Sequence, residues 1–434
     1  MCFFLLVSLP LWLFAQTYTD LLHRLESSYR YKSAQALTEA SESLYQASQG
    51  KNLPTLDATL SAIEFNEIPN MTLHMPSLFP NPITAPVGTK KHVEGALILT
   101  YPLFTGFAIS SSIDKAKLEH EEASLKLINL KRNLAMQTTL LYSTIIAEEK
   151  SIRALKSSQE AIQKAYLKAK GFYDNGMLAP SELSAIEAKK YDIDAQIMDH
   201  ENARSQYLNQ LSALLSTPVT SIEGDVYSDA PVLQESEALH KALEEREDVQ
   251  AMQKSIDVAQ SSVELAKSKN YPTVALIGML KHQGDSLALN GDGYTNADKS
   301  YLGLNVTYTL FNGFSDAHAI DAARASKMSA IFDLQAYQDQ VKTEVTNGFL
   351  ELRTLEKKLQ SAKEEFHANE TYSDLSQGRF NNQLISADEL SRAIASKAAS
   401  EAKVAAIQSQ LFNQHMRLWL LCGWNSFEKL VHLN

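Results

Sequence analysis

Acidic and imidazole side chains occur in two short stretches whose spacing invites comparison with metal sites. GDGYTNADKS, from Gly291 to Ser300, spaces acidic residues much as a calcium loop does, but it lacks the glutamate that such a loop requires. His120, Glu121 and Glu122 do not have the H-E-x-x-H spacing of a zinc site. We interpret the first stretch as an exposed loop and the second as a solvated helix face, and we predict no metal site.

The remaining composition argues against catalysis and against nucleic acid. The chain has two cysteines, Cys2 and Cys422, and removal of an N-terminal signal would leave one, which cannot form an intrachain disulfide or a cysteine metal site. The sequence contains no nucleophile–base pattern and no phosphate loop. A formal net charge of −11 disfavours nucleic acid, which selects basic surfaces. We predict a protein that is not an enzyme and that uses no cofactor.

A third group of acidic residues follows two turns in the chain. Glu182 comes after Ser181, and Asp388 and Glu389 come after Ser386. Serine caps helix N-termini, and the helix dipole favours carboxylates in the first turn. This pattern predicts that a helix begins at each serine.

The elements that position these residues are duplicated. TYPLFTGF at 100–107 recurs 207 residues later as TYTLFNGF at 307–314, with six of eight positions identical. GFYDNGMLAPSEL at 171–183 has a weaker copy, GRFNNQLISADEL at 378–390, at the same offset. KNLPTL at 51–56 recurs as KNYPTV at 269–274, at an offset of 218. The first copy therefore has 11 extra residues before its octet, in a proline-rich segment that we interpret as a long loop.

Strand-like alternation precedes the second octet. From Leu302 to Leu310, apolar residues alternate with Gly303, Asn305, Thr307 and Thr309. A period of two with apolar residues on one face is typical of a barrel wall that faces lipid. A half-buried sheet in a soluble protein alternates in the same way. The alternation alone therefore leaves both interpretations open.

Very long helices follow each octet. The segment 108–170 contains no glycine or proline, and 315–377 contains only Gly348. A continuous helix over 107–171 would be about 97 Å long at 1.5 Å per residue. Val345, Leu352, Leu359 and Phe366 recur in steps of seven, which predicts coiled-coil packing. The returning helices are shorter, and we expect the helices that precede the strands to stack end to end with them.

The apolar segment MCFFLLVSLPLWLFAQ is typical of a secretory signal, with cleavage expected after Ala15, although no basic residue precedes its apolar core. The remaining boundaries follow from the repeat. We predict a first repeat at 16–217, which comprises a helix, strand hairpin 53–106, long helix 107–171, tip turn 172–180 and returning helix 181–217. We predict a second repeat at 235–422, which comprises helix 235–269, strand hairpin 271–314, long helix 315–378, tip turn 379–385 and returning helix 386–422. An equatorial segment at 218–234 separates the repeats, and an equatorial tail occupies 423–434.

In this order and spacing, the motifs resemble the TolC family of outer-membrane efflux proteins over essentially the whole mature chain. The turn motif of that family reads approximately Y-x-x-G-x-x-S-x-x-D/E-L/V. The two copies of the motif in this chain supply, in order, Tyr173, Gly176, Ala179, Glu182 and Leu183, and then Phe380, Gln383, Ser386, Glu389 and Leu390.

The resemblance implies a mainly α fold with β-strands. In the hydrocarbon core of a membrane, four strands cannot close a barrel, and an open edge leaves unpaired backbone groups. Two, three or four chains would supply 8, 12 or 16 strands, and strand counting does not choose among them. The resemblance implies a homotrimer, with a 12-strand outer-membrane β-barrel continuous with a 12-helix periplasmic α-barrel.

The function implied by the resemblance is a passive exit duct of a tripartite efflux pump or type I secretion system. The implied partners are a periplasmic adaptor protein, an inner-membrane transporter of the RND, ABC or MFS type, and outer-membrane lipid. The alternative is a periplasmic adaptor or coiled-coil scaffold, which would be soluble without detergent.

The resemblance also implies three groups of site residues. Tyr173, Gly176, Phe380 and Gln383 would form the periplasmic tip that contacts the adaptor. Glu389, Asp388 and Glu182 would form a ring of carboxylates at the pore constriction, which favours cations; helix capping is the alternative role for these acids. The barrel strand ends would be Tyr101, Phe104, Gly106, Tyr308, Phe311 and Gly313.

Departures from the family pattern affect these assignments. Gly176 is expected to adopt the positive φ that the first turn needs. Gln383 replaces the glycine of the family, so we expect the second turn to have a different shape. Arg392 and Ile385 replace an acidic and a basic residue found in some relatives, and the charge of the constriction is expected to differ accordingly.

Overall fold

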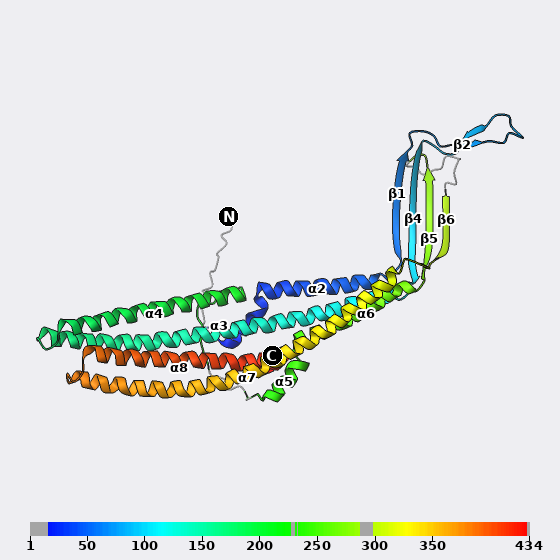
Figure 1. Cartoon of the computed structure of the whole chain (residues 1–434). Coiled ribbons are helices and arrows are strands. Elements are labelled where there is room, and N and C mark those ends of the chain that lie inside the picture. Colours follow the sequence, from blue (N-terminus) through cyan, green and yellow to red (C-terminus); the bar gives the residue numbers. More distant parts are fainter. Residues whose placement is uncertain (1–15, 227–230, 232, 287–297, 432–434) are drawn as a thin grey trace, which may run out of the picture. The chain divides into compact units, whose positions relative to one another are not determined.

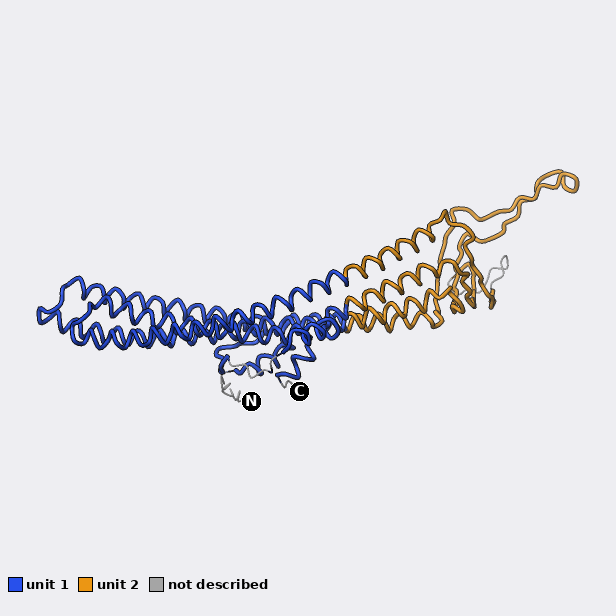
Figure 2. The backbone as a smooth tube through the Cα atoms, turned by 60° about the horizontal axis from the view of Figure 1, so that its bottom comes forward, with its two compact units in different colours: residues 1–38, 123–251, 334–434 blue, residues 39–122, 252–333 orange. Residues whose placement is uncertain are grey.

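The computed structural model describes residues 16–226, 231, 233–286 and 298–431. The predicted signal peptide, and most of the loop from Gly291 to Ser300, lie outside these residues. The chain divides into two compact units (Figure 2). Unit 1 comprises 1–38, 123–251 and 334–434, and unit 2 comprises 39–122 and 252–333.

Unit 2 contains a four-stranded antiparallel sheet with the order β1-β4-β5-β6 (Figure 1). Its strands are β1 (Thr55–Glu64), β4 (Lys91–Phe104), β5 (Thr273–Gly284) and β6 (Asp298–Thr307). Each repeat contributes one hairpin, and β4 pairs with β5 to join the two repeats. Within the described chain, β1 and β6 pair on one side only, so both edges of the sheet remain open.

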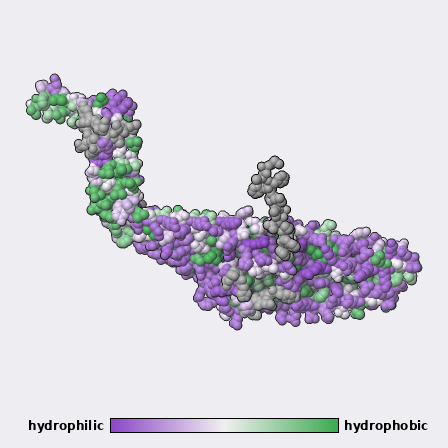
Figure 3. Space-filling view, turned by 180° about the vertical axis from the view of Figure 1, so that it is seen from behind, coloured by the Kyte–Doolittle hydropathy of each residue, from purple (hydrophilic) through white to green (hydrophobic). Residues whose placement is uncertain are grey.

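One face of the sheet is apolar and exposed. The register places Leu97 opposite Leu280 and Gly278 opposite Leu302, so their side chains share a face. Figure 3 shows hydrophobic residues gathered over the strands. The exposed apolar side chains of this face include Leu56, Leu60, Leu97, Leu280, Leu302, Leu304 and Val306.

The structure corrects two details of the strands. The strand predicted to reach Leu310 ends at Thr307, because Thr307 pairs with Thr273, the first residue of β5, and no backbone of the described chain pairs with Tyr308. The proline-rich segment predicted as a loop contains a second small sheet, β2 (Asn70–Leu73) with β3 (Ile83–Pro86). The Thr72 and Thr84 hydroxyls, 2.9 Å apart, reinforce this pair.

The repeated octet ends in the same backbone turn in both copies. Gly106 and Phe107 have φ of 61° and 69°, and Gly313 and Phe314 have φ of 67° and 66°. Two successive left-handed residues redirect the chain from the sheet into a long helix. Edge-to-face packing of Phe104 on Phe107, with ring centroids 5.4 Å apart, holds the first turn, and an equivalent aromatic pair holds the second.

The long helices α3 (Ala108–Asp174) and α7 (Ser315–Asn381) contain 67 residues each. Both continue three residues beyond the predicted ends, because Gly171 and Gly378 remain helical. Gly348, inside α7, lets helix α8 (Ala387–Leu421) approach closely. A Cβ at that position would lie 2.8 Å from Leu418 Cδ2, and Gln414 Nε2 donates to the Gly348 carbonyl at 2.8 Å.

The shorter helices differ more from the sequence prediction. The region before the first hairpin is broken into α1 (Tyr18–His23), a 3₁₀ turn η1 (Arg24–Ser27) and α2 (Tyr29–Gly50). The predicted helix 235–269 is α5 (Glu235–Glu244), α6 (Glu247–Lys267) and η2 (Ser268–Asn270). Helix α4 covers Pro180–Leu215, and the predicted C-terminal tail contains α9 (Trp424–Leu430). Within the described chain, no helix is sufficiently long and apolar to span a membrane.

A buried ionic network explains the break between α5 and α6. Arg132 of α3 is 1% exposed, and its Nη2 lies 2.6 Å from Asp248 Oδ2, while its Nε lies 3.2 Å from Glu247 Oε2. Arg246 bonds Asp248 Oδ1 at 2.9 Å and Glu344 Oε2 at 3.0 Å. The Trp424 backbone N–H donates to Glu247 Oε1 at 2.6 Å. The network therefore connects α3, α6, α7 and the start of α9 within unit 1.

The pKa values of the two carboxylates in this network shift in opposite directions. Burial alone would raise both pKa values, but Arg132 and Arg246 more than offset it at Asp248, whose pKa is lowered. At Glu247 burial prevails and the pKa is raised. The Asp248 carboxylate therefore contributes stability above the ordinary aspartate pKa, and this contribution is lost as the pH falls through its lowered folded-state value. The ionised Glu247 carboxylate costs stability above its raised pKa, and that cost disappears below the ordinary glutamate value.

We therefore expect Asp248→Asn to destabilise the protein more than Glu247→Gln at pH 7, because the fold favours the ionised form of Asp248 and disfavours that of Glu247. Urea denaturation of both variants, followed by helical circular dichroism, measures the difference. The difference should shrink in acid. Equal losses at neutral pH would show that the two carboxylates are equivalent.

Candidate functional site at the helix-hairpin turns

The two turns that join the long helices to the returning helices have the same backbone geometry. Gly176 has φ of 71° and Gln383 has φ of 57°. The Gly176 N–H donates to Tyr173 O at 2.9 Å, and the Gln383 N–H donates to Phe380 O at 3.0 Å. The left-handed residue at Gly176 confirms one prediction. The expectation that Gln383 gives a different turn is wrong, because glutamine adopts the same conformation at an energetic cost.

A pair of glycine substitutions tests the conformational requirement at Gly176. Gly176→Ala is expected to cost about 1–2 kcal/mol, because an L-residue resists a left-handed φ. Gly171→Ala, in a helical position with open space around the new methyl, is expected to stabilise by about 0.5–1 kcal/mol. Thermal or urea unfolding of the two variants measures these opposite signs. Destabilisation by both substitutions would contradict this account of the turn.

The turns pack on one another over a shared apolar core. Phe380 is 1% exposed and lies edge-to-face against Phe172, with ring centroids 6.0 Å apart. Lys168 Nζ donates to Asn381 Oδ1 at 2.7 Å, which joins α3 to α7. The buried members of this tip core are Leu155, Ile162, Ala165, Ala169, Ile186, Ile193, Ile197, Phe380, Ala387, Leu390, Ile394 and Ala398.

Phe380, which we predicted to lie at the tip that contacts the adaptor, has a side chain that is buried in the tip core. At the matching position Tyr173 is 40% exposed, so the two copies of the motif have diverged in role. Sequence reasoning missed two exposed apolar residues, Met177 and Leu384, which directly follow the two left-handed positions. The two residues occupy equivalent positions in the repeated turn motif, and this equivalence was the sequence signal that could have identified them. Tyr173, Met177 and Leu384 together form the exposed apolar surface at the turns.

The acidic residues after the turns have different local roles. Ser386 caps α8, and its Oγ accepts from the Glu389 N–H at 3.1 Å, as the capping interpretation predicts. Ser181 does not cap α4; the N-cap is Ala179, and Pro180 takes the first helical position, because its missing N–H is not needed there.

The charges of these acids are partly compensated. Asp388 forms an ion pair with Arg392 at 3.0 Å, one helical turn further on. Glu182 and Glu389 are half-buried and form no ion pair within the described chain. Of the three predicted constriction acids, Glu182 and Glu389 are therefore uncompensated within the described chain, and Asp388 adds little net charge.

The predicted strand ends lie around the octets. Tyr101 and Phe104 belong to β4, and Gly106 follows it. Tyr308, Phe311 and Gly313 follow the end of β6, where Tyr308 is 52% and Phe311 is 73% exposed. These aromatic side chains are the strand-end residues at the junction of the sheet with α3 and α7.

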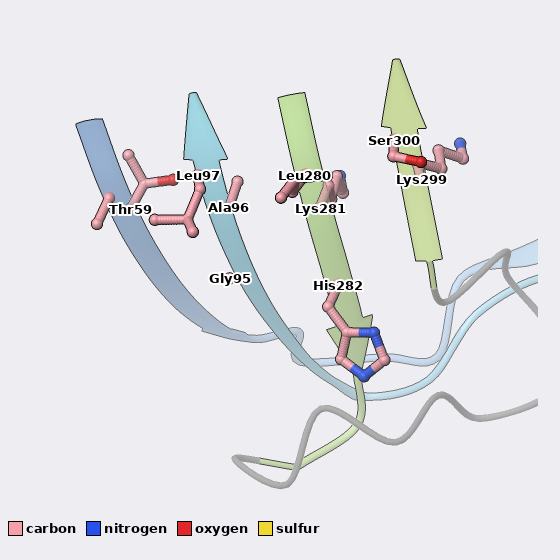
Figure 4. A pocket seen from close by; sticks show the side chains of 10 residues that line it. Thr59, Gly95, Ala96, Leu97, Leu280, Lys281, His282, Lys299 and Ser300 are labelled. Atoms are coloured by element: carbon pink, nitrogen blue, oxygen red, sulfur yellow. The ribbon is translucent and has the colours of Figure 1, made fainter. Parts of the chain in front are cut away.

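A hollow of about 550 Å³ on the sheet lies far in sequence from the turns (Figure 4). It is lined mainly by apolar atoms around Gly95, with Leu97 and Leu280 beside it and His282 and Lys299 among its lining residues. It contains no carboxylate and no nucleophile–base pair, so we interpret it as a recess in the apolar face. Among the described residues, no group of three or more His, Cys, Asp or Glu side chains could hold a metal ion.

Comparison with known proteins is consistent with this architecture. Residues 238–423 match the family model for outer membrane efflux proteins. Outer membrane protein TolC of Vibrio cholerae is 22% identical over 291 residues, which represent 61% of this chain and 63% of that protein, slightly less than two thirds of its length. The outer membrane protein VceC of Vibrio cholerae superimposes with a TM-score of 0.76 at 16% identity, covering 94% of this chain and 96% of VceC. The Campylobacter jejuni CmeC outer membrane channel gives a TM-score of 0.76 at 14% identity, covering 94% and 85%.

Both solved structures are less than 25% identical to this chain, and they show that it shares their fold of long helices and a small sheet. The family model matches less than half of the chain, and over that part the chain is similar to outer membrane efflux proteins. The proteins that it resembles are described as outer membrane proteins or outer membrane channels.

Proposed function

We propose that three copies of this chain form a passive exit duct across the outer membrane. The observation that carries the proposal is the exposed apolar sheet with two open edges in the described chain. In lipid, each unpaired backbone group costs several kcal/mol, so β1 of one copy must pair with β6 of the next. Three copies supply twelve strands for a β-barrel and a twelve-helix α-barrel below it. The predicted signal at 1–15 and the repeats at 16–217 and 235–422 remain part of this proposal.

The proposed duct works with a periplasmic adaptor and an inner-membrane transporter of the RND, ABC or MFS type, in a tripartite pump or a type I secretion system. Tyr173, Met177 and Leu384 support adaptor contact, because exposed apolar side chains at a solvent-facing turn favour a protein partner. Gly176 and Gln383 set the backbone that presents them. An adaptor or scaffold identity for the chain itself has no support from the family match.

Glu389 and Glu182 are the proposed carboxylates of the constriction. Three-fold symmetry would repeat them around the axis and favour cations. Because Arg392 compensates Asp388, we expect Glu389→Gln to reduce cation selectivity more than Asp388→Asn does. Reversal potentials in a salt gradient measure this difference.

Planar-bilayer recording of the purified protein tests the proposed conduction. Lys168→Ala removes the bond to Asn381 that joins the two hairpins, so we expect it to increase the conductance or open probability of a closed tip. Lys170→Ala, at an exposed position two residues away, is the matched control. The absence of pores from the wild type and from every tip variant would contradict the duct.

A further inference from the structure

A polar cavity lies among α3, α7 and α8, separate from the turns. Its volume is about 220 Å³, and its polar lining residues are Ser157, Ser158, Ser373, Gln377, Asp374 and Glu401, with Lys397 at its side. Ser158 precedes Gly176 by 18 residues, which is about 27 Å along a helix. All these residues belong to unit 1, and none is part of the proposed constriction.

One hydroxyl in the cavity wall lacks the bond that its neighbours make. Ser143 and Ser151, on the same helix, donate to the carbonyls of Leu140 and Ala147 at 3.1 and 3.0 Å. Ser158 is 5% exposed, and its buried Oγ has no hydrogen-bond partner in the described chain. A buried hydroxyl without a partner is costly, so an occupant that supplies one would be stabilising.

The charge of the cavity is negative. Lys397 is already paired, because its Nζ lies 3.0 Å from Glu370 Oε1. Asp374 and Glu401 form no ion pair within the described part of the chain. The lining therefore presents two uncompensated carboxylates beside a buried hydroxyl that lacks a partner.

We propose that this cavity binds an organic cation that carries N–H donors, namely a guanidinium or alkylammonium group. Such a group can donate to Ser158 Oγ and to the carboxylates of Asp374 and Glu401 at once, with charge-assisted bonds to the carboxylates. The cavity is larger than one water needs. A calcium ion requires six or more oxygen ligands, so two carboxylates and serine hydroxyls favour the organic cation. The group is carried either by a free polyamine or by a basic side chain of a docked protein.

Titration calorimetry on the detergent-purified full chain tests the proposal, with methylguanidinium and spermidine as probes. Tetramethylammonium, which has the charge but no N–H, is the matched ligand control and is expected to bind at least tenfold more weakly, because hydrogen bonds between charged groups provide about that factor. Glu401→Gln is expected to weaken binding of methylguanidinium about tenfold, and Ser158→Ala about threefold.

Ser151→Ala is the matched protein control, because that hydroxyl is already satisfied outside the cavity, and it should leave binding unchanged. Ser158→Ala removes a buried hydroxyl that has no partner in the described chain, so the variant should fold at least as stably as the wild type. If native mass spectrometry finds a polyamine bound to protein purified from its own membranes, the natural ligand is a free polyamine. If the purified protein carries no polyamine but binds the probes, the natural ligand is a basic side chain of a docked protein. Equal binding of tetramethylammonium, or unchanged affinity in both cavity variants, overturns the proposal and leaves the duct function unaffected.

Discussion

Replacing Arg132 by methionine is expected to destabilise the protein by about 3–5 kcal/mol, the typical cost of removing one partner from a buried ion pair. The guanidinium is 1% exposed and contacts the carboxylates of Glu247 and Asp248, and its Nη1 donates to the Leu420 carbonyl at 3.3 Å. The methionine can fill part of the space, but it leaves the Glu247 carboxylate buried without its cation and leaves Asp248 with Arg246 alone. The loss should reach α6, α8 and the start of α9 together, because the network connects them.

Lys156→Met is the matched control for Arg132→Met. Lys156 Nζ lies 2.8 Å from Glu201 Oε1, a shorter ion-pair distance than several in the network, but both side chains are about half exposed. Solvent screening limits such a pair to about 0–1 kcal/mol. Urea denaturation of both variants, followed by helical circular dichroism in the same detergent, gives the comparison. Losses of similar size would show that burial does not control the energy of these pairs.

Gly106→Ala is expected to destabilise the protein by about 2–5 kcal/mol, because it combines a backbone cost with a steric one. The φ of 61° disfavours any L-residue. The new methyl would lie 2.5 Å from the Ser268 carbonyl oxygen and 2.8 Å from Tyr271 Cβ, so the end of η2 would have to move. Because this contact joins the two repeats at the base of the sheet, we also expect less protein to reach the outer membrane.

Gly313→Ala separates the two contributions. Gly313 occupies the matching position of the second octet with φ of 67°, but a methyl added there would have no atom of the described chain within 4 Å. Only the backbone cost of about 1–2 kcal/mol should remain. Unfolding midpoints and outer-membrane yields of the two variants provide the measurement. A loss at Gly313 as large as that at Gly106 would mean that contact with Ser268 and Tyr271 contributes little.

The architecture could be predicted from the sequence because its signals are local and duplicated. The octets, the glycine-free segments and the seven-residue recurrence each depend on neighbouring residues, and the common offset of 207 relates the two copies. Gly176 was predictable for the same reason, since glycine is the residue that most readily adopts a positive φ.

The errors at the turns arose where tertiary packing decides the outcome. Phe380 and Tyr173 occupy the same motif position, but only Phe380 packs on Phe172 of the other hairpin. Gln383 is forced into the left-handed conformation by the turn that surrounds it. Ser181 lost the capping position because Pro180 starts the helix one residue earlier.

The Arg132 network could not be predicted from the sequence. Arg132 is separated from Asp248 by 116 residues and from Leu420 by 288 residues, and no periodic pattern connects such positions. Ser158 presents the same difficulty: it follows Ser151 by seven residues on the same helix, but only the Ser151 hydroxyl donates to a backbone carbonyl.

The measurement that tests the central claim most directly is the mass of the detergent-purified mature protein, determined by light scattering after its recovery from outer-membrane fractions. Closure of the sheet edges by other copies predicts a particle with the protein mass of three chains, and β1 and β6 are then paired between copies. A monomer that remains in solution without detergent would contradict the account, because its apolar sheet face and open edges could not then belong to a membrane barrel.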